Sequence, residues 1–149
     1  MLDQIFVGAA LVGVSAIVQA VFMFGGFHAL QAMRVHERQF ARHHATAIIM
    51  LFVMFMFMAI IVEVWIWAAA YYWLGAIGTF SDALYVSTDS FTTIGQNTVP
   101  VASDWRLLVA FEGGAGMIIF GWATALLIAA IQHFDVWPSA SRRRRSHNP

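Results

Sequence analysis

Three long apolar runs alternate with shorter polar segments along the chain. They cover residues 5–30, 46–75 and 105–134. An α-helix rises about 1.5 Å per residue and the hydrocarbon core of a bilayer is about 30 Å thick, so each run is long enough to cross a membrane. A helix also satisfies its own backbone hydrogen bonds, as a lipid environment demands. The pattern therefore predicts an all-α membrane protein with three transmembrane helices.

Between the second and third runs lies a segment that suits a helix but is too short to span. Residues 81–92 begin with Ser81, a good N-cap, and Asp82, which favours the positive helix end. Such a helix crosses only about half of the hydrocarbon core. Non-helical backbone at membrane depth is tolerated only where it is buried in protein or lines a watery path. The segment predicts either an ion pathway or an ordinary extracellular loop with a short surface helix.

The composition narrows the class of protein. Of the 149 residues, 60% are hydrophobic and 11% are charged, and the chain has no cysteine and no lysine. These values indicate one membrane domain, with no disulfide and no cysteine-ligated metal site. A formal net charge of zero gives no attraction to nucleic acid. No nucleophile–base pair or metal-ligand set converges, so we expect neither an enzyme nor a cofactor.

The arginines set the expected orientation. Arg34, Arg38 and Arg42 lie between the first and second runs, and Arg142 to Arg145 follow the third. Because basic loops stay on the cytoplasmic side, both segments should be cytoplasmic. The N-terminus is then outside, and the short helix with its loop dips into the membrane from outside. The linker itself suits a basic helix lying along the lipid headgroups.

Two carboxyl groups and several glycines within the apolar runs have two interpretations each. Glu63 and Glu112 are either functional groups or neutral, hydrogen-bonded carboxyls that tie helices together, because an unpaired charge in a membrane is costly. We expect neither to reach unpaired into lipid. Gly8, Gly13 and the pair at 25–26 could permit close approach of another helix. We favour the simpler view that they are small residues on a lipid-facing helix.

The short segment leads into the string Thr92-Thr93-Ile94-Gly95. This string matches the start of the Thr-Thr-Val/Ile-Gly-Tyr-Gly-Asp filter of the tetrameric potassium-channel superfamily, and the region from about 45 to 132 resembles the pore domain of that family. Further matches are a proline after the filter, an inner-helix start, a hinge glycine and a cavity-lining run, at Pro100, Trp105-Arg106-Leu107, Gly116, and Phe120-Gly121 with Thr124-Ala125. The family's tyrosine, second glycine and aspartate are absent, and the segment from Gly95 to the proline is one residue shorter.

The resemblance implies a domain order and an assembly. It makes 1–32 an additional N-terminal transmembrane helix, 33–45 a basic cytoplasmic linker, 46–134 the pore domain and 135–149 a basic cytoplasmic tail. One re-entrant loop cannot surround an ion, so the protein should be a homotetramer. Its expected location is the bacterial inner membrane, with membrane lipids as its other partners.

The resemblance also implies site residues for a permeant monovalent cation, K⁺ or Na⁺. The filter ligands would be Thr92, Thr93, Ile94, Gly95, Gln96 and Asn97. Asp89 would support the filter from behind or, alternatively, face an outer aqueous crevice. The inner cavity would be lined by Met117, Phe120 and Thr124, and Gly116 would act as a hinge.

The filter sequence predicts how selective such a pore is. Gly95 permits the positive φ that a stack of carbonyls needs at alternate positions, whereas Gln96 lacks this freedom and Asn97 is only moderately tolerant of it. We expect the ordered stack to end after Gly95 and the outer mouth to be wider and lined by side chains. The sequence thus predicts a cation channel that separates potassium from sodium weakly. The alternative is a non-conducting scaffold or a heteromeric channel subunit with a degenerate filter.

Overall fold

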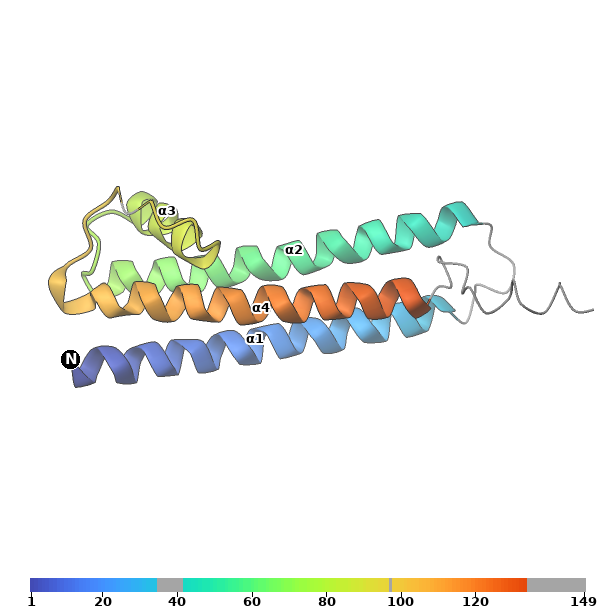
Figure 1. Cartoon of the computed structure of the whole chain (residues 1–149), viewed down its shortest axis with the longest axis horizontal. Helices are drawn as coiled ribbons and strands as arrows, with labels where there is room; N and C mark the ends of the chain where they lie inside the picture. Colours follow the sequence, from blue (N-terminus) through green and yellow to red (C-terminus); the bar gives the residue numbers. More distant parts are fainter. Residues whose placement is uncertain (35–41, 97, 134–149) are drawn as a thin grey trace, which may run out of the picture.

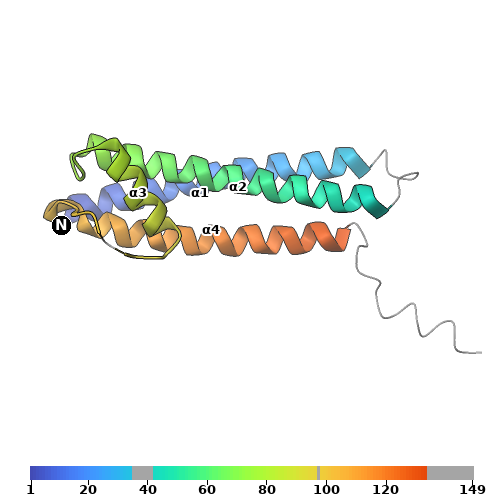
Figure 2. The same cartoon turned by 90° about the horizontal axis from the view of Figure 1, so that it is seen from above.

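Three long helices lie side by side and a short one packs against one end of the bundle (Figures 1 and 2). The computed structural model describes residues 1–34, 42–96 and 98–133, and these contain no β-strand. The elements are α1 (Leu2–Arg34), α2 (Arg42–Trp73), α3 (Phe80–Phe91), the single 3-10 turn η2 (Ser103–Trp105) and α4 (Arg106–His133). α1 and α4 begin at the end that carries α3, and α2 runs in the opposite direction.

The three predicted spans are confirmed. Residues Leu2–Ala29, Ala47–Trp73 and Ser103–Gln132 are long and apolar enough to cross a membrane. The protein is therefore an all-α integral membrane protein. The segment predicted as a linker is helical at both edges, because α1 continues to Arg34 and α2 begins at Arg42. Its centre, the proposed headgroup helix and the tail at 135–149 lie outside the described residues.

The short helix exists, but its predicted N-cap is wrong. Thr79, not Ser81, caps α3, with extended backbone at φ −125° and ψ 146°. The Asp82 backbone N–H donates to Thr79 Oγ1 over 3.1 Å, and the Thr79 hydroxyl donates to Asp82 Oδ2 over 2.7 Å. This reciprocal pair satisfies donors of the first turn, and Ser81 lies inside the helix, because α3 begins at Phe80.

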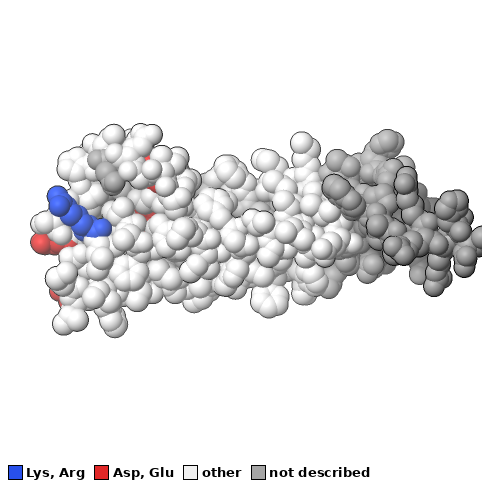
Figure 3. Space-filling model, in the orientation of Figure 1, with Lys and Arg blue, Asp and Glu red and all other residues white. Residues whose placement is uncertain are grey.

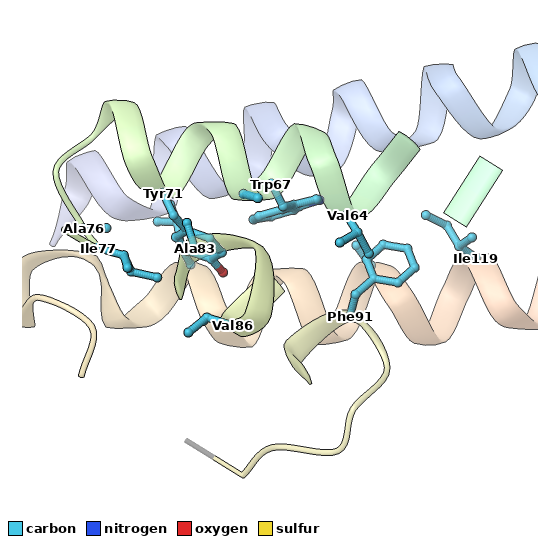
Figure 4. Close-up of a cluster of buried hydrophobic side chains, with 12 residues drawn as sticks. Val64, Trp67, Tyr71, Ala76, Ile77, Ala83, Val86, Phe91 and Ile119 are labelled. Carbon is cyan, nitrogen blue, oxygen red and sulfur yellow. The ribbon is translucent and has the colours of Figure 1, made fainter. Parts of the chain in front are cut away.

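The main core lies where α3 packs between α2 and α4 (Figure 4). Among the fully buried side chains there are Trp67 and Tyr71 from α2, Phe91 from α3 and Leu108 from α4. A smaller cluster of Phe52, Met56 and Ala130 lies further along the bundle. In the face seen in Figure 3, charged side chains gather at the α3 end, and the rest of the described bundle surface is uncharged, as a lipid-facing surface requires.

α1 packs closely on both α2 and α4, which corrects our expectation for two of its glycines. A Cβ at Gly8 would lie 2.7 Å from the Phe111 ring, and one at Gly26 would lie 2.9 Å from the Phe52 ring. Nothing lies within 4 Å of such an atom at Gly13. Gly8 and Gly26 are therefore contact positions for large aromatic rings, since only a missing side chain leaves room for them.

Polar contacts also tie α1 to its neighbours. The Trp67 indole N–H donates to Ser15 Oγ over 3.0 Å in the buried α1–α2 interface. Gln4 Oε1 accepts a hydrogen bond from the Leu107 backbone N–H over 3.2 Å. Because the first N–H groups of a helix have no partner within it, Gln4 stabilises the start of α4. α1 is thus an integral part of the bundle.

Candidate functional site

The chain leaves α3 through a helix-ending motif that places the next residues in an unusual conformation. The Thr93 N–H donates to the Ser90 carbonyl over 2.9 Å, and the Ile94 N–H donates to the Asp89 carbonyl over 3.0 Å. This pair of bonds is a Schellman motif, in which the residue after the cap adopts the left-handed conformation. Here that residue is Thr93, with φ 60°.

The end of α2 shows the same motif with the usual residue. Gly75 has φ 66°, its N–H donates to the Tyr72 carbonyl over 3.1 Å, and the Ala76 N–H donates to the Tyr71 carbonyl over 2.9 Å. Glycine adopts this conformation freely, whereas for a β-branched residue it costs roughly 1–2 kcal/mol. Such strain concentrates at functional sites. The backbone is therefore strained at Thr93 but not at Gly75, although both residues have the same conformation.

Positive φ recurs two residues later. Gly95 has φ 69°, a conformation that glycine adopts freely, and Ile94 between the two is not left-handed. Positive φ at alternate positions is the conformation that a stack of carbonyls requires. Residues 93–96 are also exposed in the single chain, with Ile94 at 64%. Non-helical backbone of this kind, if at membrane depth, must line water or be covered by other protein.

Tyr85 on α3 contacts the outer part of the loop, a role that was not predicted from the sequence. Its hydroxyl donates to Gln96 Oε1 over 3.3 Å and accepts from the Thr98 hydroxyl over 3.3 Å. The predicted ligand Asn97 lies outside the described residues. The sequence offered one signal for Tyr85: a phenol on the short helix, two to three turns before the loop, has the reach to meet it.

Asp89 lies on the buried side of α3. Asp89 is 8% exposed, which favours a position of its side chain behind the loop over a position in an outer aqueous crevice. Its backbone carbonyl accepts from Ile94 and, over 3.4 Å, from the Gly95 N–H. The carbonyl end of α3 therefore points at the loop, and the negative end of the helix dipole suits a cation.

The predicted cavity residues share one exposed face of α4, but the chain alone does not bring them around an axis. Met117 is 65% exposed. The Phe120 ring packs edge-on against Phe91 at a centroid distance of 5.9 Å, and the Thr124 hydroxyl donates to the Phe120 carbonyl over 2.8 Å. Phe120 and Thr124 also border an apolar cavity of about 170 Å³ between α2 and α4. Their role in an inner cavity stays a prediction.

Gly116, the predicted hinge, has a packing role in the structure. It lies against the end of α3, where an added Cβ would be 2.1 Å from the Phe91 carbonyl oxygen. Gly113, one turn earlier, faces the Ser90 carbonyl, with the corresponding distance at 3.4 Å. α4 therefore approaches the loop-bearing end of α3 through glycines. The hinge motion itself remains a prediction.

Both intramembrane glutamates are buried in protein, as expected, and neither faces lipid. Glu112 accepts a hydrogen bond from the Tyr71 hydroxyl over 2.6 Å and contacts the Ser87 hydroxyl. Glu63 is equally buried, but neither of its carboxyl oxygens has a hydrogen-bond partner among the described residues. The hydrogen-bonded state thus holds for Glu112 only.

A bundle of spanning helices in which a half-helix ends in a strained, exposed loop defines a pore-loop membrane protein. A model of the protein family described as "Ion channel" matches residues 59–133, half of the chain, from the middle of α2 to the end of α4. The chain belongs to this family, with a pore domain of the two-helix, potassium-channel type. Neither the curated proteins nor the solved structures gave a match. α1 lies outside the matched residues.

Proposed function

We propose that the protein is a homotetrameric channel for monovalent cations, K⁺ or Na⁺, with its pathway along the loop of residues 92–97. The observation that carries this proposal is the alternation of positive φ at Thr93 and Gly95 directly after the carbonyl end of α3. In channels of this kind, backbone carbonyls and threonine hydroxyls replace the water shell of the ion. Thr93 supplies the hydroxyl at the inner end, and the carbonyls of Thr93, Ile94 and Gly95 form the stack.

Cation preference follows from the groups around the loop. The described part of the loop carries no basic side chain, and the C-terminal end of α3 directs its partial negative charge toward it. Asp89, buried behind the loop, adds a further acidic group. These features favour a positive ion and disfavour an anion.

The need for several copies follows from exposure. In one chain, residues 93–96 are open to the surroundings, and α4 exposes large apolar side chains on the neighbouring face, among them Met117, Ile118 and Trp122. Four copies around one axis cover both surfaces and give each ion four equivalent sets of carbonyls. Phe120 and Thr124 then belong to the inner cavity.

Weak discrimination between potassium and sodium follows from the outer part of the loop. Strong discrimination goes with several consecutive layers of backbone oxygens. The segment is short, and the Gln96 side chain is engaged by Tyr85, so the outer layers differ from the family pattern. An ion there keeps part of its water shell, and discrimination by size weakens.

The same features support the second candidate, a non-conducting scaffold or a subunit of a mixed channel. Its carrying observation is the contact of Gln96 with Tyr85, which fixes an outer segment that lacks the family's tyrosine and second glycine. In either case we propose the bacterial inner membrane, with the N-terminus outside and the arginine-rich linker and tail in the cytoplasm.

One experiment separates the candidates. The purified chain is weighed by native mass spectrometry in nanodiscs and then placed in planar bilayers with KCl on one side and NaCl on the other. A tetramer that conducts with a reversal potential near zero supports the proposal. A monomer or dimer overturns the assembly. A conducting tetramer with a reversal potential near the potassium equilibrium value overturns weak selectivity, and a tetramer without current supports the scaffold.

A further inference from the structure

A buried polar cluster lies behind α3, on the side away from the exposed loop. It contains Tyr71 of α2, Ser87 of α3 and Glu112 of α4, each 0% exposed. The Tyr71 hydroxyl lies 2.6 Å from Glu112 Oε2, and Ser87 Oγ lies 2.8 Å from the Val64 carbonyl oxygen. Ser87 Oγ also forms a hydrogen bond with Glu112 Oε1. The cluster thus joins the three elements that frame the loop.

The number of protons in the cluster indicates that the Glu112 carboxyl group is protonated. The three oxygen–oxygen contacts need one proton each, and the hydroxyls of Tyr71 and Ser87 supply only two. If Glu112 is ionised, the Ser87 hydroxyl can donate its proton to either the Val64 carbonyl or Glu112 Oε1. The other contact then joins two oxygen atoms with no proton between them. A proton on Glu112 supplies the missing donor.

With that proton in place, every contact is satisfied in one direction. Tyr71 donates to Oε2 of Glu112. The acid donates from Oε1 to Ser87 Oγ, and Ser87 donates to the Val64 carbonyl. Burial acts in the same sense, because an unpaired charge in a membrane interior is costly, and no ion pair of Glu112 exists among the described residues.

We propose that protonated Glu112 is the positioning residue that holds α3, and through α3 the loop of residues 92–96, at its place in the channel. Where it concerns conduction, this inference rests on the proposed function. Glu112 holds Ser87, and Asp89, two residues later, carries the carbonyl that accepts from Ile94. A shift of α3 at Ser87 therefore moves the anchor of the strained loop.

Glu112 is also one turn from Gly116 on α4, the residue that lies against the Phe91 carbonyl. The side of α4 that holds α3 through Glu112 thus continues through Gly116 to the beginning of the loop. Hydrogen bonding at one end and close packing at the other add to the packing of the core in fixing the depth and the rotation of α3.

The test compares Glu112→Gln with Glu112→Leu, Ser87→Ala and Tyr71→Phe in the full-length protein in nanodiscs. Glutamine has the donor and acceptor of a protonated acid, so it should rescue the contacts, whereas leucine cannot. Tyr72→Phe is the matched control for Tyr71→Phe, because Tyr72 is exposed on the next position of α2. Ser87→Ala is the mild variant that keeps the test valid if Glu112→Leu does not fold.

Two readouts do not depend on conduction. Infrared spectra should show a protonated-carboxyl band that Glu112→Gln removes and Tyr72→Phe leaves unchanged. Amide hydrogen exchange over residues 88–96 should stay at the wild-type rate in Glu112→Gln and speed up at least several-fold in Glu112→Leu, Ser87→Ala and Tyr71→Phe. The third readout is the reversal potential in opposed KCl and NaCl, which should shift in the same three variants.

The outcomes separate this inference from the proposed function. If the wild type carries no current but the band and the exchange pattern are as expected, the channel proposal fails and the position of Glu112 stands. If Glu112→Gln removes no protonated-carboxyl band, or if its amides exchange as fast as those of Glu112→Leu, the proposal that protonated Glu112 positions α3 is wrong. If exchange changes in the three variants while a conducting channel keeps its reversal potential, the link from Glu112 to selectivity is wrong.

Discussion

Gly116 of α4 and the carbonyl of Phe91 at the end of α3 are in direct contact. A Cβ built on Gly116 would lie 2.1 Å from that carbonyl oxygen and 3.0 Å from the carbonyl carbon. The obstacle is backbone, which cannot rotate away as a flexible side chain can. This contact sets the distance between the inner helix and the residues that open the loop, one residue before Thr92.

The first prediction concerns Gly116→Ala. We expect it to push α3 away from α4 and to destabilise the assembled protein by about 1–3 kcal/mol, the usual cost of overpacking. Gly121→Ala is the matched control on the same helix, because nothing lies within 4 Å of its Cβ. Thermal unfolding in detergent measures both. If Gly116→Ala keeps wild-type stability and alters only the open probability, the residue serves as a hinge and not as a packing position.

The second prediction separates strain from chemistry at Thr93. Thr93→Gly should remove about 1–2 kcal/mol of left-handed strain and leave the assembly as stable as the wild type or more stable. It also deletes the hydroxyl proposed to bind the cation, so current should fall sharply. Thr93→Ser is the control that keeps the hydroxyl. The prediction fails if Thr93→Gly conducts like the wild type, because the hydroxyl then has no part in the pathway.

The third prediction concerns Tyr85→Phe. The substitution keeps the ring but removes the hydroxyl that joins Gln96 and Thr98. Because both bonds are exposed, the loss in stability should stay near or below about 1 kcal/mol. The outer loop becomes less ordered, so the reversal potential in opposed KCl and NaCl should move further toward zero. Tyr72→Phe is the control, and equal reversal potentials in all three proteins would remove Tyr85 from the selectivity mechanism.

The helices were predictable because lipid allows few alternatives. A continuous apolar run in lipid must become a helix. The rise per residue also predicted that the helix before Thr92 is too short to cross the membrane. The N-cap was missed by two residues, because Ser81 and Thr79 are both acceptable caps and only the contact with Asp82 decides between them. Local signals therefore placed the elements but not their first residues.

The contacts between elements were not predictable in the same way. Periodicity tells which residues share a helix face, but not which neighbour that face meets. Glu112 was recognised as unusual, yet its partners Tyr71 and Ser87 are 41 and 25 residues away in sequence. Thr93 was missed as a left-handed residue because its own preference opposes that conformation, and only the hydrogen bonds to the end of α3 impose it.

Glu63 of α2 and Gln19 of α1 are buried polar residues, each one turn away in sequence from a residue of the Ser15–Trp67 contact between the two helices. Ser15 and Trp67 are hydrogen-bonded across α1 and α2. Because the two helices run in opposite directions (Figure 1), Gln19 on α1 and Glu63 on α2 each lie one turn from that contact, in the same direction along the bundle. Both are buried, and neither Glu63 oxygen nor Gln19 Oε1 has a partner among the described residues.

The fourth prediction uses this shared lack of partners. No ion pair of Glu63 exists among the described residues, so Glu63→Gln should leave assembly unchanged. Gln19→Leu or Glu63→Leu should each raise the stability, by up to about 1–3 kcal/mol, because each removes a buried polar group that has no partner among the described residues. The double variant removes both groups and should be the most stable of the four proteins, because an apolar pair needs no hydrogen bonds. Thermal unfolding of the four proteins gives the coupling energy. A loss of stability in either single variant would mean that Gln19 and Glu63 satisfy each other, and that this pair holds α1 to α2.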